Sequence, residues 1–207
     1  MVQRNIRTDK WPIVAASEQK KLLQSTVSEF RYLVGVIYTH WLTIGRLQLN
    51  EQIPAVERLI HATAKNPEIK YQYFGSRFHK FPSYYRRGAI QFAVGQVSSF
   101  VTRYREWQSG IRKRRTVFPP RLNAECGTYP PLYKNQCIRF ADDNNSAAIK
   151  VFTGIDWIWT TVGVTGHRQR YLNPDNKRKS PYLIVNSQGC HLSVPFQIKA
   201  LHPCGMI

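Results

Sequence analysis

Residues 180–196, SPYLIVNSQGCHLSVPF, contain two short apolar runs separated by Ser187-Gln188-Gly189. Two such runs on either side of a glycine-containing turn are typical of a β-hairpin, because glycine readily adopts the positive φ that a tight turn requires. The sequence therefore predicts antiparallel strands over residues 182–186 and 190–196.

Upstream of this hairpin, three further runs have the composition of strands and lie at residues 137–140, 147–152 and 157–164. The turn residues Asp142-Asp143-Asn144-Asn145 separate the first two runs. At the N-terminus, residues 2–8 also resemble a short strand, and we expect Trp11-Pro12 to break the chain after it. A first strand so distant in sequence from the others predicts a small antiparallel β-barrel that the first strand helps to close.

The segment between the first strand and the others has helical character. Apolar residues recur at a 3.6-residue period from Ser17, a favourable N-cap, to about Leu49. Pro54 is suited to open a second helix, which Asn66-Pro67 ends. A third helix is expected from Pro82-Ser83 to residues 107–110.

Within the third helix, Gly88 and Gly95 are positions where another helix or a backbone can approach closely. Residues 68–80, just before it, have the composition of a polar and aromatic connector. The expected fold class is therefore α+β, a small antiparallel β-barrel with an inserted helical lobe. The barrel is predicted to comprise residues 1–12 and 117–200, the lobe residues 13–116, and a tail residues 201–207.

The net charge is the strongest functional indication. Thirty Lys and Arg residues against twelve Asp and Glu residues give a formal charge of +18 over 207 residues. A domain with this imbalance repels itself, and a polyanion relieves the repulsion and releases counterions. Because the sequence has no long apolar run and no myristoylation signal, we expect nucleic acid rather than a membrane as the partner. The expected location is cytoplasmic and nucleoid-associated, in a prokaryote.

Two clusters of cations are candidates for contacts with phosphates. The first belongs to the predicted lobe and the loop that follows it, and comprises Arg77, Lys80, Arg86, Arg87, Arg103, Arg105, Arg112, Lys113, Arg114, Arg115 and Arg121. The second belongs to the predicted barrel and comprises Arg168, Arg170, Lys177, Arg178 and Lys179. Arg112-Lys113-Arg114-Arg115 is the densest run; a solvated charge run or a localisation signal is its alternative interpretation.

Aromatic residues alternate with the cations of the lobe, and Tyr71, Tyr73 and Tyr84 are candidates for stacking on unpaired bases. Packing in the core of the lobe is the competing interpretation of such aromatic residues.

No catalytic or metal site can be argued from the sequence. The four cysteines lack the closely spaced ligand pairs of zinc sites, although His191 adjoins Cys190 and His202 lies near Cys204. Asp156, which follows Gly154-Ile155, is a carboxylate to consider as a metal ligand. Its position before the final hairpin favours instead a role at the start of a strand. We therefore expect no catalytic residue, no metal and no cofactor in this chain.

Three segments together resemble the TnpB family of insertion sequences and its relatives, the compact type V CRISPR effectors. These segments are Ala16–Leu23 with Phe30–Val34 and Tyr38–Trp41, then Phe81–Trp107 with Phe118-Pro119-Pro120-Arg121, and finally Ser180–Val185 with Gly189–Phe196. The resemblance implies an OB-like barrel, the wedge domain, with an inserted helical recognition lobe. In that family a RuvC nuclease domain follows the last hairpin, whereas here only residues 197–207 follow Phe196.

The resemblance implies binding of a guide-RNA scaffold, a target-adjacent DNA motif and the guide–target heteroduplex. Cleavage would come from a RuvC part that is separately encoded or missing, and Mg²⁺ is expected only there. The expected partners are guide RNA, target DNA and a RuvC-containing chain, with no membrane. A guide-independent DNA-binding protein, such as a repressor or a transposition accessory, is the alternative, and a fragment of a longer nuclease remains a further one.

Overall fold

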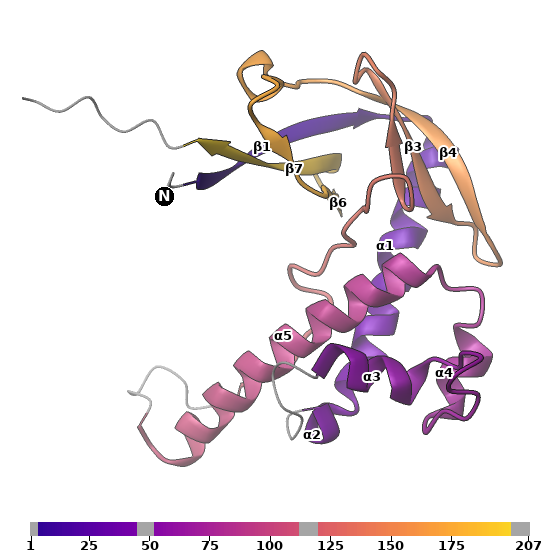
Figure 1. Cartoon of the computed structure of the whole chain (residues 1–207), viewed down its shortest axis with the longest axis vertical. Coiled ribbons are helices and arrows are strands. Elements are labelled where there is room, and N and C mark those ends of the chain that lie inside the picture. The colour runs from indigo at the N-terminus through magenta and orange to yellow at the C-terminus, as the bar shows by residue number, and fades with distance from the viewer. Residues whose placement is uncertain (1–3, 45–51, 112–119, 200–207) are drawn as a thin grey trace, which may run out of the picture. The chain divides into compact units, whose positions relative to one another are not determined.

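The computed structural model describes residues 4–44, 52–111 and 120–199 and has an α+β fold (Figure 1). The chain divides into two compact units. The sheet unit consists of Met1–Val27 and Tyr129–Ile207, and the helical unit consists of Ser28–Thr128. The sequence placed the boundaries at residues 12 and 117, whereas the compact units divide after Val27, inside the first helix, and after Thr128.

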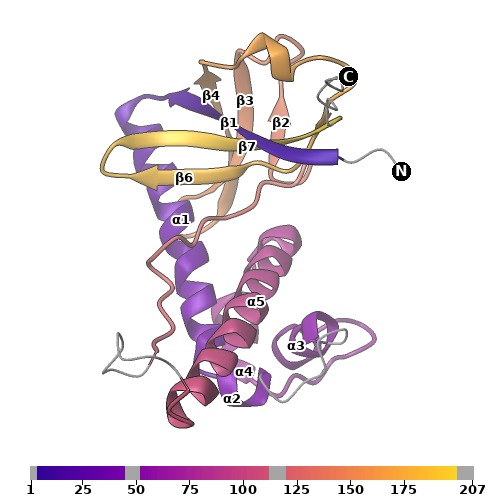
Figure 2. The ribbon, with the colours of Figure 1, turned by 90° about the vertical axis from the view of Figure 1, so that its left-hand side faces the viewer.

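The sheet unit contains an antiparallel sheet that curls into a half-barrel (Figure 2). In the described residues its strands are β1 (Arg4–Val14), β2 (Ile138–Phe140), β3 (Ser146–Phe152), β4 (Trp157–Val164), β5 (Lys177–Arg178), β6 (Tyr182–Asn186) and β7 (Gly189–Lys199). Their order is β2-β3-β4-β1-β7-β5, and β6 also pairs with β7. The predicted strands of the hairpin and of residues 137–164 are confirmed, whereas β5 was not predicted.

Strand β1 is longer than the sequence indicated, and the prediction that Trp11-Pro12 breaks it is wrong. β1 pairs with β7 from Arg4↔Lys199 to Pro12↔His191. Proline lacks an N–H, but the carbonyl of Pro12 accepts a hydrogen bond from Thr165 N at 3.0 Å, so the strand keeps a partner on that side. β1 joins β4 only beyond this point, at Ile13 and Val14.

Gly166 has a φ of +72°, and an added Cβ would lie 2.9 Å from Pro12 Cδ. Glycine is needed here on both grounds, and it lets the loop after β4 pass close to β1.

The core of the sheet unit follows from strict alternation along the strands. In β3 the residues Ala147, Ile149 and Val151 are buried, and their neighbours are only half-buried. The first turns of helix α1 (Ser17–Tyr38) add Leu23 and Val27 to the core. Thr26 Oγ1 accepts a hydrogen bond from Phe152 N at 2.8 Å, so this part of α1 is bonded directly to β3.

The helical unit contains the rest of α1 and the helices α2 (Trp41–Ile44), α3 (Gln52–Ile60), α4 (Gln72–Arg77) and α5 (Ser83–Gln108). α3 and α5 were predicted, but α3 begins at Gln52 and ends at Ile60, so the prediction that Pro54 opens this helix and Asn66-Pro67 ends it is wrong. The prediction of one helix to about Leu49 is wrong, because α1 ends at Tyr38. There the N–H groups of Thr39 and His40 bond the carbonyls three residues earlier, which tightens the last turn. The connector over residues 68–80 contains α4, which was not predicted.

The two glycines of α5 differ in their surroundings. Gly88 is buried, in keeping with a close approach, but Gly95 is exposed and an added Cβ there would have no neighbour within 4 Å. The expectation of close packing is therefore wrong for Gly95.

An ion pair between Arg77 and Glu29 joins α4 to α1 within the helical unit. Arg77 Nη1 and Nη2 donate to the two carboxylate oxygens of Glu29 at 2.7 and 2.9 Å. The side chain of Glu29 is only 9% exposed, and these hydrogen bonds raise the pKa of the Arg77 guanidinium. The geometry is the bidentate one that makes arginine–carboxylate pairs strong.

We expect Arg77→Ala to lower the free energy of unfolding by about 2 kcal/mol, because it leaves a buried carboxylate without its cation. Urea denaturation measures the change. Arg58→Ala, at an exposed arginine of α3, is the matched control and should change stability by less than about 0.5 kcal/mol. Equal stability of the two variants would contradict this role of the ion pair.

Candidate nucleic-acid interface

The second cationic cluster lies on one loop of the sheet unit, residues 165–179, here called the cationic loop. It contains Arg168, Arg170, Lys177, Arg178 and Lys179, and Asp175 is its one acidic residue. The loop includes the short 3₁₀ helix η1 (Gln169–Tyr171) and ends in β5, so its cations are held on ordered backbone.

The buried carboxylate of Asp9 on β1 anchors the start of the cationic loop. Asp9 is 2% exposed, and its Oδ2 accepts hydrogen bonds from Trp11 Nε1 at 2.9 Å and from Arg168 N at 3.0 Å. Arg168 Nε also lies 3.6 Å from Asp9 Oδ1. Part of the charge of Arg168 is therefore compensated within the protein.

The middle of the loop packs on β7 through an aromatic stack. The ring of Tyr171 stacks on Phe196, with centroids 5.4 Å apart and planes 16° apart. Asn176 Nδ2 donates to the carbonyl of Arg170 at 3.1 Å and closes the loop on itself. The Arg170 guanidinium carbon lies 4.9 Å from the centroid of the Tyr171 ring, so this cation is held at the surface of the stack.

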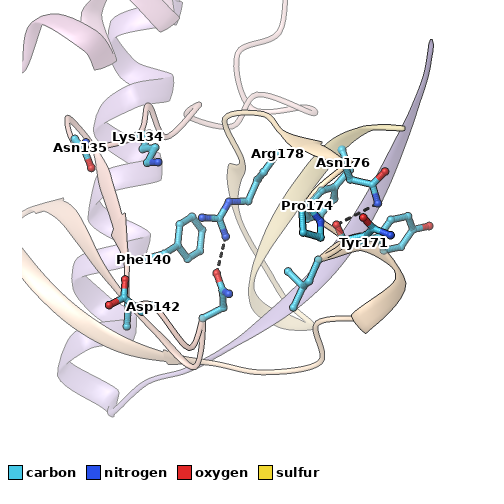
Figure 3. Close-up of a pocket in the computed structure, with 13 residues that line it drawn as sticks. Lys134, Asn135, Phe140, Asp142, Tyr171, Pro174, Asn176 and Arg178 are labelled. Atoms are coloured by element: carbon cyan, nitrogen blue, oxygen red, sulfur yellow. Dashed lines mark hydrogen bonds between the residues drawn. The ribbon is translucent and has the colours of Figure 1, made fainter. Parts of the chain in front are cut away.

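Arg178 differs from the other cations of the loop because it is half-buried. Its guanidinium carbon lies 4.2 Å from the ring centroid of Phe140, and Nη1 donates to Asn144 Oδ1 at 2.6 Å (Figure 3). Burial lowers the pKa of this guanidinium, but arginine stays protonated at neutral pH. Within the described ranges, no carboxylate forms an ion pair with Arg178.

Arg178 lines an open pocket of about 440 Å³ between the β2–β3 turn and the cationic loop (Figure 3). The other lining residues are mostly polar or aromatic: Lys134, Asn135, Phe140, Ala141, Asp142, Asn144, Tyr171, Leu172, Asn173, Pro174, Asn176 and Phe196. A second hollow, of about 610 Å³, is lined by Arg7, Arg170, Tyr171, Asn173, Asp175, Asn176 and Ile198. Tyr171, Asn173 and Asn176 line both, so the loop forms a wall between them.

Lys177 and Lys179 are exposed, on either side of Arg178. β5 pairs Arg178 with Phe196, and strand alternation directs its two neighbours the other way. The structure thus brings the predicted residues of this cluster together on one loop, while it gives Arg178 a different environment from the two lysines.

Sequence reasoning missed the residues that hold Arg178 in place, which are Phe140 and Asn144. Asn144 has a φ of +59° in the turn that was predicted from its composition. Its contact with Arg178 joins residues 34 positions apart, and no local pattern indicates such a contact.

In the helical unit, two of the predicted arginines have structural partners. Arg77 is paired with Glu29, as described above. Arg86 is 6% exposed, donates to the carbonyl of Phe81 at 2.8 Å, and has its pKa lowered by burial. Arg86 therefore has a structural position inside the helical unit, in contrast to its predicted contact with phosphate.

The remaining predicted cations of the helical unit are more accessible. Lys80, Arg87, Arg105 and Arg121 are exposed. Arg103 is half-buried, and its Nε donates to the carbonyl of Ser99 at 3.2 Å. Arg112, Lys113, Arg114 and Arg115 lie outside the described residues.

The three tyrosines predicted to stack on bases differ in exposure. Tyr73 is 47% exposed and its hydroxyl is hydrogen-bonded to that of Tyr32, while Tyr84 is 37% exposed. Tyr71 is half-buried and already stacks on His40, with ring centroids 3.8 Å apart. Tyr73 and Tyr84 are thus the better candidates of the three.

Asp156 takes part in the turn before β4. Its carboxylate accepts a hydrogen bond from Trp157 N at 2.8 Å, and its carbonyl accepts one from Thr153 N at 2.9 Å. Among the residues that the structure describes, no three His, Cys, Asp or Glu side chains gather as a metal site would require. In the same part of the chain, none of the helices has the length and apolar character needed to cross a membrane.

Comparison with known proteins gives a family for the chain. No curated protein matches it. The model of the Aq_aa04 family matches residues 7–153, which run from within β1 through the helices to the end of β3 and account for more than half of the chain. The chain therefore belongs to the Aq_aa04 family.

Proposed function

We propose that this protein binds nucleic acid, and that the cationic loop of the sheet unit contacts the phosphate backbone. The observation that carries the proposal is Arg178, a half-buried guanidinium that lines an open pocket and has no acidic partner among the described residues. A cation left uncompensated in a partly desolvated position favours an anionic ligand.

The surroundings of Arg178 are suited to a phosphate that belongs to a polymer. Its planar guanidinium can form two parallel hydrogen bonds to phosphate oxygens. The exposed Lys177 and Lys179 point to the other face of the strand and add to the positive charge of the cationic loop. The amide of Asn173 lines the same pocket and supplies a neutral donor. With the net charge of +18, this arrangement favours a polyanion over a small anion.

The wider proposal follows from the resemblance to TnpB and the compact type V effectors. The sheet unit would act as an OB-like wedge domain and the helical unit as a recognition lobe. Together they would hold guide RNA, the target-adjacent DNA motif and the guide–target heteroduplex. Cleavage would come from a RuvC part outside this chain, and the protein itself would not cut.

The test of the proposed phosphate contact is Arg178→Gln, measured by fluorescence anisotropy with the RNA recovered from the purified protein. We expect affinity to fall about tenfold or more, because a charged hydrogen bond contributes roughly 1.5–3 kcal/mol. Arg178→Lys keeps the charge but not the planar guanidinium with its two parallel donors, and should recover part of the lost affinity. Thermal melting confirms that both variants remain folded.

Lys20→Gln is the matched control, because Lys20 is exposed in α1 and lines neither hollow. It should change affinity by less than about threefold, as expected for a general loss of one charge. Equal affinities of the Arg178→Gln and Lys20→Gln variants would contradict a specific role for the pocket. Purified protein that carries no RNA but binds one duplex DNA sequence selectively would favour a guide-independent DNA-binding protein.

A further inference from the structure

The outer face of strands β2, β3 and β4 carries aromatic and cationic side chains that have no assigned role. Alternation directs Ile138, Ile149 and Val162 into the core, where each is at most 2% exposed. The alternate positions, Arg139, Lys150 and Trp159, therefore share the opposite face of the sheet.

The strand register brings these side chains together. Lys150 is paired with Trp159, and Phe152 with Trp157, in adjacent rows of the β3–β4 ladder. The Arg139 guanidinium carbon lies 4.3 Å from the Trp159 ring centroid and Lys150 Nζ lies 5.7 Å from it. The ring of Trp157 packs against that of Phe152, with ring centroids 5.2 Å apart. We call Arg139, Lys150, Phe152, Trp157 and Trp159 the tryptophan face.

The tryptophan face is accessible and positively charged. Arg139 is exposed, and the other four side chains are half-buried. Ala148 lies between Arg139 and Thr161 in the row beside Trp159, and its small side chain lets the Arg139 guanidinium reach the Trp159 ring across it. The sequences of β2, β3 and β4 contain Arg139 and Lys150 but no Asp or Glu.

We propose that the tryptophan face binds an unpaired segment of nucleic acid. Its bases would stack on Trp157, on Trp159 and on the guanidinium plane that Trp159 supports, while Arg139 and Lys150 neutralise the adjacent phosphates. Aromatic rings and arginine planes on an open sheet are an effective platform for unpaired bases. A duplex does not fit this chemistry, because its base faces are covered by their neighbours.

This inference rests on the proposed function, because it adds a second type of contact to the same ligand class. The cationic loop contacts phosphates, and a loss of its charge weakens binding whether or not bases are present. The tryptophan face contacts bases, and its contribution disappears when the bases are removed. The two sites are therefore distinguished by comparing a single-stranded oligonucleotide with an abasic strand of equal length.

The experiment measures binding of both strands to the wild-type chain and to Trp159→Ala by anisotropy. We expect the wild type to bind the normal strand about tenfold more tightly than the abasic one, since stacking contributes about that factor for each base. Trp159→Ala should lose most of this preference, and Trp159→Phe should keep part of it. Ile155→Ala, at an exposed apolar residue of the β3–β4 turn, is the matched control and should keep the full preference.

Three results would overturn the inference. If the wild type binds the normal and abasic strands equally, the tryptophan face stacks no base, although phosphate binding by the cationic loop stands. The inference is also wrong if Trp159→Ala, shown by circular dichroism to be folded, keeps the preference. If the chain binds neither strand, the proposed function fails with it.

Discussion

Replacement of Trp11 by alanine should destabilise the sheet unit by about 3–5 kcal/mol, the usual cost of removing a large aromatic side chain from a core. Trp11 is fully buried. Its ring lies 5.6 Å from Phe140, 5.7 Å from His167 and 6.1 Å from Phe196, measured between centroids. The cavity would thus open at the point where β1, β2, β7 and the cationic loop meet.

The same substitution also removes a hydrogen bond from a buried charge. Trp11 Nε1 donates to Asp9 Oδ2 at 2.9 Å, and Asp9 is 2% exposed. The loss leaves the carboxylate with fewer partners, and such a loss adds to the cost of the cavity. Because Asp9 also accepts the N–H of Arg168, we expect the cationic loop to lose order together with the core.

Urea denaturation followed by far-ultraviolet circular dichroism measures this effect. The net stability of a domain is roughly 5–15 kcal/mol, so a loss of this size shifts the midpoint strongly or leaves the sheet unit unfolded in water. Ile6→Ala on the same strand is the control, because Ile6 is 56% exposed, and it should cost less than about 1 kcal/mol. If Trp11→Ala is as stable as Ile6→Ala, the Trp11 side chain is not a packed part of the core of the sheet unit.

The strands were the part of the fold that the sequence predicted best, because their signal is local. β4 and β6 have the predicted bounds, since alternation and turn residues mark both ends. β1 was predicted too short, because a proline is tolerated in a strand where no neighbouring strand needs its N–H, and the pairing that decides this is long-range: β1 pairs with β4 only at Ile13 and Val14. The end of α1 at Tyr38 was also missed, because the apolar period continues through the turn at Thr39 and His40 into α2.

The candidate sites show the same division between local and long-range information. The cations of residues 168–179 are close in sequence, so composition was enough to place them together. The distinct position of Arg178 depends on Phe140 and Asn144, which only the folded sheet brings to it. The tryptophan face was not predicted, although Trp157 and Trp159 alternate visibly, because its charge comes from Arg139 and Lys150 on neighbouring strands whose register was unknown.

Binding of RNA should weaken steeply as salt concentration rises, because the affinity comes largely from phosphates neutralised by Lys and Arg. The chain has a formal charge of +18, and the described surface offers cations on the cationic loop, on the tryptophan face and on the helical unit. If about six to ten phosphates are contacted, affinity should fall by about 10³–10⁵ between about 50 and 200 mM salt. Arg178→Gln should make the slope shallower by about one contact.

The most direct test of nucleic-acid binding is this titration, with the logarithm of the association constant plotted against the logarithm of salt concentration. The RNA recovered with the protein is the ligand, and polyglutamate of similar charge is the control polyanion. We predict a linear plot with a slope of about −0.7 to −0.9 for each phosphate contacted, and much weaker binding of polyglutamate. A slope near zero, or equal affinity for RNA and polyglutamate, would contradict the proposal that this protein binds nucleic acid.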